Sequence, residues 1–118
     1  MTLARGSLVL VDLEPTRGHE QRGTRPCLVV SDPAVNASQR FPLIAVVPIT
    51  GTPAPGALYP PLSPGANGLT KPSYALVDRL RSIDKQRIRR GYGHVSEAEL
   101  AAVDAGLRLY LGLEPDPG

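Results

Sequence analysis

Apolar positions fall into short runs rich in β-branched residues, and polar or proline-containing segments separate these runs, which predicts a mainly β chain. The expected strands are Ser7–Leu13, Cys27–Ser31, Leu43–Thr50, Tyr74–Asp78 with a continuation over Arg81–Ile83, and Ile88–Val95. Because Pro48 has no N–H to donate, we expect its part of the third strand to be an edge, a bulge or the strand's exit.

The segments between these strands are predicted to be loops. Gly18 and Gly23 interrupt the polar segment Arg17–Thr24, and Asn36–Gln39 follows the strand-ending Asp-Pro pair. Gly51–Gly65 contains five prolines, so we expect a surface loop with at most a short edge strand near Leu58–Tyr59.

The end of the chain has a different period. Ser96 and Glu99 form a capping-box pattern, and apolar residues then recur at helical spacing. These residues are Leu100, Val103, Leu107 and Leu111. We therefore predict an amphipathic helix over Glu97–Leu113, ended by Pro115 and Pro117 and packed on the sheet. Strands followed by one helix indicate a single α+β domain, a compact barrel with a helix laid on it.

Composition restricts the core and the compartment. About 42% of the residues are hydrophobic but only 4% are aromatic, so the core must consist of Val, Leu, Ile and Ala. The single cysteine, Cys27, excludes an internal disulfide and lies in an apolar run, which predicts a small buried residue in a reducing compartment. No signal peptide or membrane-length apolar run is visible, so a soluble cytoplasmic protein is expected.

Basic residues gather in two stretches although the net charge is only +2. One stretch holds Arg17, Arg22 and Arg25, and the other holds Arg79, Arg81, Lys85, Arg87, Arg89 and Arg90. Such clusters attract polyanions, but they are equally compatible with a solvated basic face.

Several kinds of catalytic site find no support in the sequence. His19, His94 and Cys27 do not have metal-ligand spacing, so we expect neither a metal nor another cofactor. The chain also lacks a Gly-x-Ser-x-Gly elbow and a phosphate-binding Gly-x-x-x-x-Gly-Lys-Thr loop.

The polar segment Gly18–Arg25 provides a carboxylate, an imidazole, an amide and guanidinium groups, and Thr50 ends another strand. This set suits RNA cleavage without a metal. A base removes the ribose 2′-OH proton, a cation stabilises the phosphorane, and an acid protonates the leaving 5′-oxygen. The alternatives are structural: Arg25 as a turn residue or an ion-pair partner of Glu20, and Thr50 as an ordinary strand residue.

The run Gly18-His19-Glu20-Gln21-Arg22-Gly23-Thr24-Arg25-Pro26 resembles the Gly-x-Glu-Gln-x-Gly-x-Arg-Pro signature of the MazF/PemK toxins. Val46–Thr50 resembles that family's strand leading to its catalytic threonine, and Asp78–Asp84 resembles a later family segment. The similarity extends over Arg5–Leu113 in the same order.

The resemblance implies a small SH3-like twisted β-barrel of the plasmid maintenance toxin/CcdB-like kind, with a C-terminal helix and a tail over residues 114–118. It also implies a homodimeric toxin of a type II toxin–antitoxin system. Such a toxin cuts single-stranded mRNA at specific sequences without a metal, leaving 2′,3′-cyclic phosphate and 5′-hydroxyl ends. A cognate MazE-like antitoxin would neutralise it by ordering a flexible segment on the toxin surface.

Site roles follow by the same resemblance. Arg25 would stabilise the transition state and could also act as acid, Thr50 would contact the scissile phosphate, and Glu20 would act as base or orient Arg25. The expected RNA-binding residues are His19, Gln21, Arg22, Asp78, Arg79 and Arg81.

Three positions depart from the family pattern. Leu76 stands where one branch has a second catalytic arginine, so that branch's use of Asp78 cannot be transferred. Pro61–Pro64 should weaken or displace a usual strand, and Arg79 replaces a common Gln, so we expect either a different cleavage specificity or a low activity. Two other functions remain open, a gyrase-poisoning toxin of the CcdB kind and a nucleic-acid-binding barrel without catalysis.

Overall fold

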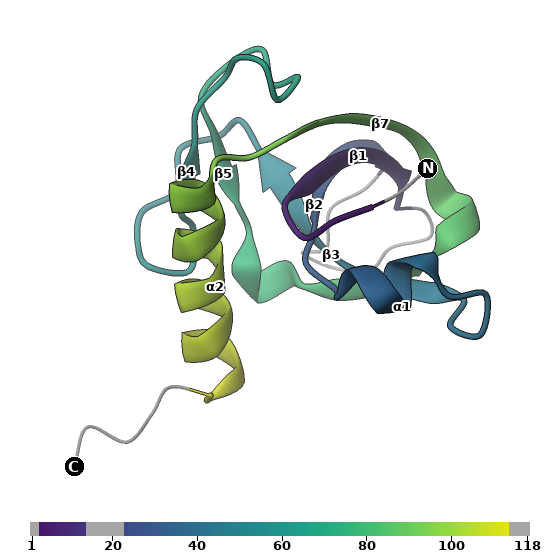
Figure 1. Ribbon diagram of the computed structural model, residues 1–118. Helices are drawn as coiled ribbons and strands as arrows, with labels where there is room; N and C mark the ends of the chain where they lie inside the picture. The colour runs from purple at the N-terminus through teal and green to yellow at the C-terminus, as the bar shows by residue number, and fades with distance from the viewer. Residues whose placement is uncertain (1–2, 14–22, 114–118) are drawn as a thin grey trace.

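The computed structural model describes residues 3–13 and 23–113, whose seven strands form one strongly curled antiparallel sheet (Figure 1). The strand order is β4-β5-β3-β2-β1-β7, and β6 pairs with β3 beside β5. The strands are β1 (Ser7–Asp12), β2 (Thr24–Val29), β3 (Leu43–Thr50), β4 (Pro61–Leu62), β5 (Ser73–Ala75), β6 (Arg81–Asp84) and β7 (Ile88–His94). The helices are α1 (Pro33–Ala37), α2 (Glu97–Leu111) and the 3-10 turns η1 (Val77–Arg79) and η2 (Lys85–Arg87).

The curl gives the sheet two apolar faces, and each has its own core. Successive residues of β2 alternate between them, since Leu28 packs with α2 and Cys27 packs on the opposite side. The core under α2 contains Leu8, Leu28, Val47, Ile49, Leu62, Val77, Val103 and Leu107. The core on the other face contains Val9, Val11, Leu13, Cys27, Val29, Ile44, Val46 and Ile83. As composition predicted, these cores are aliphatic.

Pro48 lies inside β3, at the point where the strand changes partners. On one side of β3, Pro48 pairs with Cys27 of β2. On the other side, β6 pairs with Leu43–Val46 and β5 pairs with Ile49 and Thr50. Between those two partners Leu76 donates its N–H to the Pro48 carbonyl at 2.8 Å. A proline fits here because its missing donor falls in the gap between two ladders.

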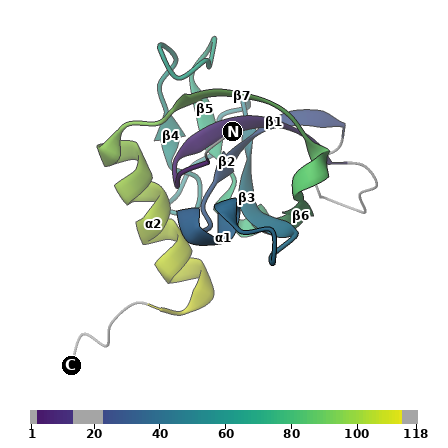
Figure 2. The same ribbon diagram turned by 45° about the vertical axis from the view of Figure 1, so that its right-hand side comes forward.

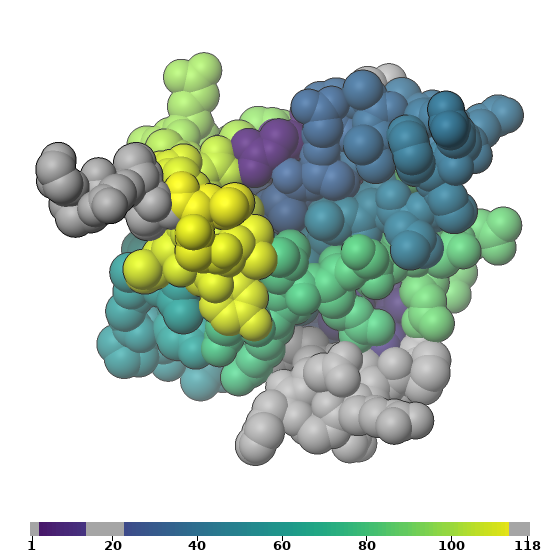
Figure 3. All heavy atoms as spheres, turned by 90° about the horizontal axis from the view of Figure 1, so that it is seen from below, coloured from purple at the N-terminus to yellow at the C-terminus, as the bar shows by residue number. Residues whose placement is uncertain are grey.

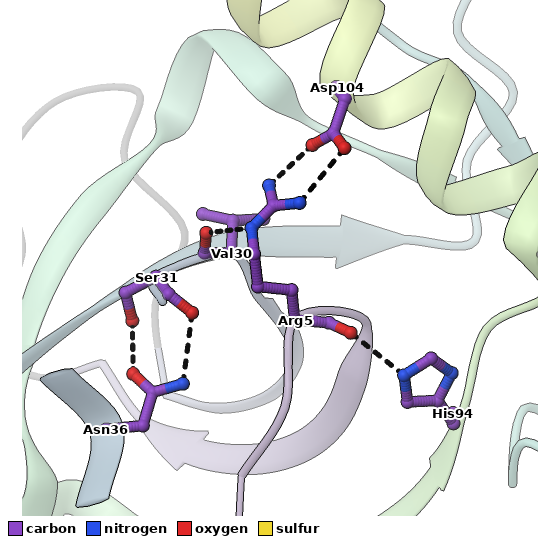
Figure 4. Close-up of polar contacts among 6 residues, drawn as sticks. All are labelled: Arg5, Val30, Ser31, Asn36, His94 and Asp104. Atoms are coloured by element: carbon purple, nitrogen blue, oxygen red, sulfur yellow. Dashed lines mark hydrogen bonds and ion pairs between the residues drawn. The ribbon is translucent and has the colours of Figure 1, made fainter. Parts of the chain in front are cut away.

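Polar contacts attach the N-terminal segment to α2 (Figure 4). The Arg5 guanidinium donates to the Val30 carbonyl at 2.8 Å and grips both carboxylate oxygens of Asp104. His94, at the end of β7, lies with Nε2 at 2.8 Å from the Arg5 carbonyl. This Arg–carboxylate pair is bidentate, the geometry that gives guanidinium its strongest contacts.

Helix α2 confirms the capping box and crosses beside the sheet (Figure 2). The Glu99 N–H donates to the Ser96 hydroxyl, and the Ser96 N–H donates to the Glu99 carboxylate. Gly112 ends the helix in the left-handed conformation at φ 71°. Seen from below, the yellow helix lies against the teal segment that precedes β5 (Figure 3). Leu111 does not join the core as its spacing suggested, because it is exposed beyond the sheet.

Four sequence-based assignments are wrong. The predicted loop Asn36–Gln39 overlaps α1, because Asp32 accepts the Ala34 N–H as N-cap and Pro33 suits the first turn. The edge strand expected near Leu58–Tyr59 forms instead at Pro61–Leu62. The strand expected to reach Asp78 ends at Ala75, and η1 follows it. The second strand begins at Thr24, so Arg25 is a strand residue.

None of the helices within the described residues has the length and apolar character needed to cross a bilayer.

Glu99 gives a test of the contact between α2 and Ser63, the residue that follows β4. Burial alone would raise its carboxyl pKa, but hydrogen bonds from the Ser63 N–H, at 2.7 Å, and from Ser96 lower it. A lowered folded-state pKa means that the carboxylate stabilises the fold at neutral pH and ceases to do so as pH falls through that pKa. We expect Glu99→Gln to lower the free energy of unfolding by about 0.5–1 kcal/mol at pH 7.

Urea unfolding at pH 7 and pH 3 measures this effect. The difference between Glu99→Gln and the wild type should be smaller at pH 3 than at pH 7. Glu97→Gln, an exposed change in the same helical turn, is the matched control and should have little effect. An equal loss at both pH values for Glu99→Gln would contradict the assignment.

Candidate active site at the ends of strands β2 and β3

The β2–β3 register brings Arg25 and Thr50 to the same face of the sheet. Cys27 and Pro48 form the last pair of this antiparallel ladder, and extending its register by two more residues would set Arg25 opposite Thr50. Directly opposite residues project to the same side, with Cβ atoms about 4.5–5.5 Å apart. Arg25 is exposed and Thr50 half-buried, so both side chains are at the surface. The two residues predicted to be catalytic therefore lie at adjoining ends of the paired strands β2 and β3.

This pair belongs to a longer row across five strands. On one side of the pair Val11 of β1 lies opposite Arg25, and on the other Tyr74 of β5 lies opposite Thr50. Pro61 of β4 then lies opposite Tyr74. Tyr74 was not singled out by sequence reasoning, because only the strand pairing reveals that it adjoins Thr50.

Thr50 is positioned by the turn that follows it. Its Oγ1 accepts a hydrogen bond from the Thr52 N–H at 3.1 Å. A hydroxyl that accepts such a bond keeps its own proton available for donation to a ligand oxygen. The Thr50 hydroxyl is therefore held at the strand end in a state that can bind a phosphoryl oxygen.

Arg81 lies on the same sheet face as Thr50, but its side chain contacts the backbone at the end of β1. It pairs with Val46, four residues before Thr50, and its guanidinium donates a long bond of 3.4 Å to the Leu13 carbonyl. The Leu13 N–H in turn donates to the Gly23 carbonyl at 2.9 Å. Arg81 therefore supports the two chain ends that flank residues 14–22.

Other cations of the basic stretch also make structural contacts. Arg87 donates to the Asp12 carbonyl at 3.3 Å, and Arg89 pairs with the Asp12 carboxylate at 3.1 Å. Lys85 donates to the Val35 and Ser38 carbonyls at the end of α1. The basic stretch Arg79–Arg90 is thus neither one solvated basic face nor one continuous surface for binding a polyanion.

Asp78 and Arg79 lie in η1, which packs against α2, and the structure does not bring them into the Arg25–Thr50 row. Asp78 accepts the Tyr59 hydroxyl at 2.8 Å, and this hydrogen bond raises the Tyr59 pKa, while the Arg79 charge lowers it. The second Asp78 oxygen is buried and has no hydrogen-bond partner among the described residues. RNA binding by Asp78 and Arg79 stays a prediction.

Arg25 also lines a cavity of about 380 Å³ at the same end of the sheet. Its other charged lining residues are Lys71 and Arg90, which come from two further segments of the chain. Lys71 crosses directly over Gly51, where a Cβ would lie 2.6 Å from its Nζ. Sequence reasoning missed Lys71, since an isolated lysine in a loop gives no signal of its own.

Four predicted site residues, His19, Glu20, Gln21 and Arg22, lie outside the described residues. Among the residues that the structure does describe, no group of His, Cys, Asp and Glu is arranged to hold a metal ion. The described part of the site contains the Arg25 guanidinium and the Thr50 hydroxyl, which come from separate strands. The Lys71 ammonium group and the Tyr74 phenol belong to neighbouring residues. Guanidinium and hydroxyl donors are suited to holding a phosphodiester.

Cys27 lies two residues from Arg25 but does not contribute a nucleophile. Burial raises the pKa of its thiol to about 12, although the Arg81 charge acts in the opposite direction. Its Sγ lies 3.8 Å from the Arg25 carbonyl and is fully buried. A neutral buried thiol is unreactive, because the thiolate is the nucleophile.

Comparison with known proteins identifies relatives over nearly the whole chain. Residues 4–111 match the family model described as PemK-like, MazF-like toxin of type II toxin–antitoxin system. The chain is 39% identical over 117 residues to endoribonuclease MazF9 of Mycobacterium tuberculosis, covering 94% of this chain and 98% of that protein.

Solved structures agree with this match. MazF of Deinococcus radiodurans superposes with a TM-score of 0.81 at 30% identity, covering 95% of this chain and 98% of that one. A MazE–MazF structure from the same organism gives a TM-score of 0.76 at 30% identity, covering 97% and 99%.

The buried thiol provides a test of this part of the site. In the native protein at pH 8, Cys27 should not react with a disulfide reagent such as DTNB, because little thiolate forms and the sulfur is inaccessible. Unfolding in guanidinium should release one reactive thiol per chain. A Ser82→Cys variant, whose added thiol would be exposed on β6, is the control and should react at once. Equally fast labelling of Cys27 in the native protein would contradict the burial.

Proposed function

This chain belongs to the PemK-like, MazF-like toxins of type II toxin–antitoxin systems and is an endoribonuclease of that family; on this premise we propose that it cuts single-stranded RNA without a metal at Arg25 and Thr50. The observation that supports this proposal is the β2–β3 pairing, which sets the two residues at adjoining strand ends, while strand alternation directs both to one face. One phosphodiester that lies across these two strand ends could contact both residues.

The reaction is an internal transfer within the RNA. The ribose 2′-oxygen attacks the adjacent phosphorus, the bond to the 5′-oxygen breaks, and the products carry a 2′,3′-cyclic phosphate and a 5′-hydroxyl. Negative charge grows on the non-bridging oxygens as the phosphorane forms. The planar Arg25 guanidinium can donate hydrogen bonds to two of these oxygens. Because these oxygens carry more negative charge in the transition state than in the substrate, Arg25 binds the transition state more strongly.

Thr50 orients the same phosphate. Its hydroxyl accepts from the Thr52 N–H and donates to a phosphoryl oxygen, which fixes the phosphorus relative to Arg25. A donor held in place before the substrate arrives does not need to reorganise during the reaction. Tyr74, directly across from Thr50, adds a phenol at the edge of this position.

Two protons remain to be transferred. We assign removal of the 2′-OH proton to Glu20, with orientation of Arg25 as its alternative role, and protonation of the leaving 5′-oxygen to Arg25 or to water. His19, Gln21, Arg22 and Arg81 are proposed to contact the RNA around the cut. The requirement for a 2′-OH nucleophile makes RNA, and not DNA, the substrate.

The partners follow from the family. The MazE–MazF structure from Deinococcus radiodurans contains a toxin with its antitoxin, and we propose that a MazE-like antitoxin neutralises this chain too. We also propose that it acts as a homodimer in the cytoplasm and selects a short RNA sequence.

Cleavage of a long single-stranded transcript in excess EDTA tests the proposal. Wild-type protein should cut it and leave cyclic-phosphate and 5′-hydroxyl ends, identified by mass spectrometry. Arg25→Ala should lower kcat/KM roughly 100- to 1000-fold, because it removes a donor that stabilises transition-state charge. Thr50→Val should lower it roughly tenfold, the usual effect of losing one hydrogen bond.

Arg40→Ala is the matched control, since Arg40 is exposed and lies over Phe41, outside the candidate site. It should retain wild-type activity, and circular dichroism should show that all variants fold. Full activity of Arg25→Ala would remove Arg25 from the mechanism. A strict requirement for added Mg²⁺ would overturn the metal-free reaction.

A further inference from the structure

We propose that the cavity lined by Arg25, Lys71, Arg90 and Tyr92 binds the nucleotide next to the scissile phosphate and selects its base. This inference rests on the proposed function, because it takes the substrate to be single-stranded RNA cut at Arg25. It assigns a role to three residues, Lys71, Arg90 and Tyr92, that lie outside the Arg25–Thr50 row.

The cavity has the charge and size for one nucleotide. Its volume is about 380 Å³, its lining includes three cationic side chains and one tyrosine, and it contains no carboxylate among the residues that line it. Phosphate binding alone would need only the cations. The added aromatic ring and the volume of the cavity favour a ligand with both a phosphate and a flat base.

Tyr92 provides the stacking surface. The tyrosine is 37% exposed, and the Arg90 guanidinium lies 4.7 Å from the centre of its ring. Single-stranded RNA is commonly held by bases that stack on aromatic rings and on guanidinium planes. In this cavity both kinds of surface come from neighbouring positions of β7.

The wall that holds Tyr92 is fixed before any ligand binds. Gly68, at φ 95°, lies so close to Tyr92 that a Cβ there would be 2.8 Å from the tyrosine Cβ. The Gly93 N–H donates to the Asn67 carbonyl at 3.0 Å. The buried Asn67 side chain bonds both the Ser63 carbonyl and the Leu69 N–H. A rigid wall of this kind can discriminate between bases, because it cannot adapt its shape to each one.

The cavity and the catalytic row meet at Arg25. Pro26, Ile49 and Gly51 line the cavity from the sheet face opposite that of Thr50, and Lys71 passes over Gly51 immediately after Thr50. An RNA strand that crosses the ends of β2 and β3 would place one phosphate beside Arg25 and Thr50. Its neighbouring nucleotide would then reach the cavity, with Lys71 close to the backbone between them.

Tyr92 variants test the base contact. After the cleavage sites of the wild type are mapped on a long transcript, Tyr92→Leu should raise KM about tenfold, as expected for loss of one stacked base, with kcat little changed. Its cuts should also lose preference at one nucleotide position flanking the scissile bond. Tyr92→Phe keeps the ring and should keep both properties. Tyr110→Leu, an exposed tyrosine change on α2, is the matched control.

Lys71→Gln gives a second test that does not disturb the packed wall. It should weaken binding of a 2′-O-methyl RNA of the cleavage-site sequence, measured by fluorescence anisotropy, and lower the salt slope by about one. Arg40→Gln is the charge-matched control and should leave both unchanged. The 2′-O-methyl RNA cannot be cut, because it lacks the nucleophile.

The two proposals fail in different ways. Unchanged KM and base preference in Tyr92→Leu, together with unchanged RNA binding in Lys71→Gln, would overturn the nucleotide site and leave the nuclease assignment intact. Should wild-type protein not cleave RNA at all, the anisotropy measurement is made with a mixed-sequence 2′-O-methyl RNA. Binding that depends on Lys71 and Tyr92 would then uphold the cavity as a nucleotide site while the cleavage proposal falls.

Discussion

The register between β2 and β3 is the constraint on which the site depends. When it is extended by two residues beyond Cys27 and Pro48, this register sets Arg25, near the beginning of β2, opposite Thr50, at the end of β3. A slip of one residue would turn one of the two side chains to the opposite face. Both faces of the sheet are apolar, so the alternation of side chains along β2 and β3 would not by itself exclude such a slip. Pro48 limits pairing at the opposite edge of β3, where its missing N–H lies in the gap between β5 and β6.

The basic residues divide into supporting and ligand-facing groups, and this division explains how a chain of net charge +2 can concentrate positive potential at one place. Arg5, Lys85 and Arg89 are occupied by carbonyl or carboxylate partners. Arg25, Lys71 and Arg90 line one cavity that has no carboxylate in its lining. Charges placed together in a concave site focus the field more effectively than the same charges spread over a surface.

Regular patterns in the sequence predicted the regular parts of the fold. Leu43–Thr50 and the capping box of α2 are found where the apolar period and the Ser96–Glu99 spacing placed them. Short elements were missed because their causes are not periodic. Helix α1 depends on the Asp32 cap, and the two-residue β4 depends on pairing with β5. The likeness to known toxins drew attention to Arg25 and Thr50, but only the three-dimensional pairing reveals Tyr74 and Lys71 beside them.

The position of Arg25 within a strand has a physical consequence for catalysis. A residue that precedes proline is confined to extended backbone, so Pro26 holds Arg25 in the conformation that β2 requires. Pro26 itself pairs with Leu10 of β1, which anchors this short stretch to the neighbouring strand. An arginine in a loop would lose backbone and side-chain freedom on binding a phosphate. Here the backbone is already ordered, so more of the binding energy of the guanidinium fork remains available to stabilise the transition state.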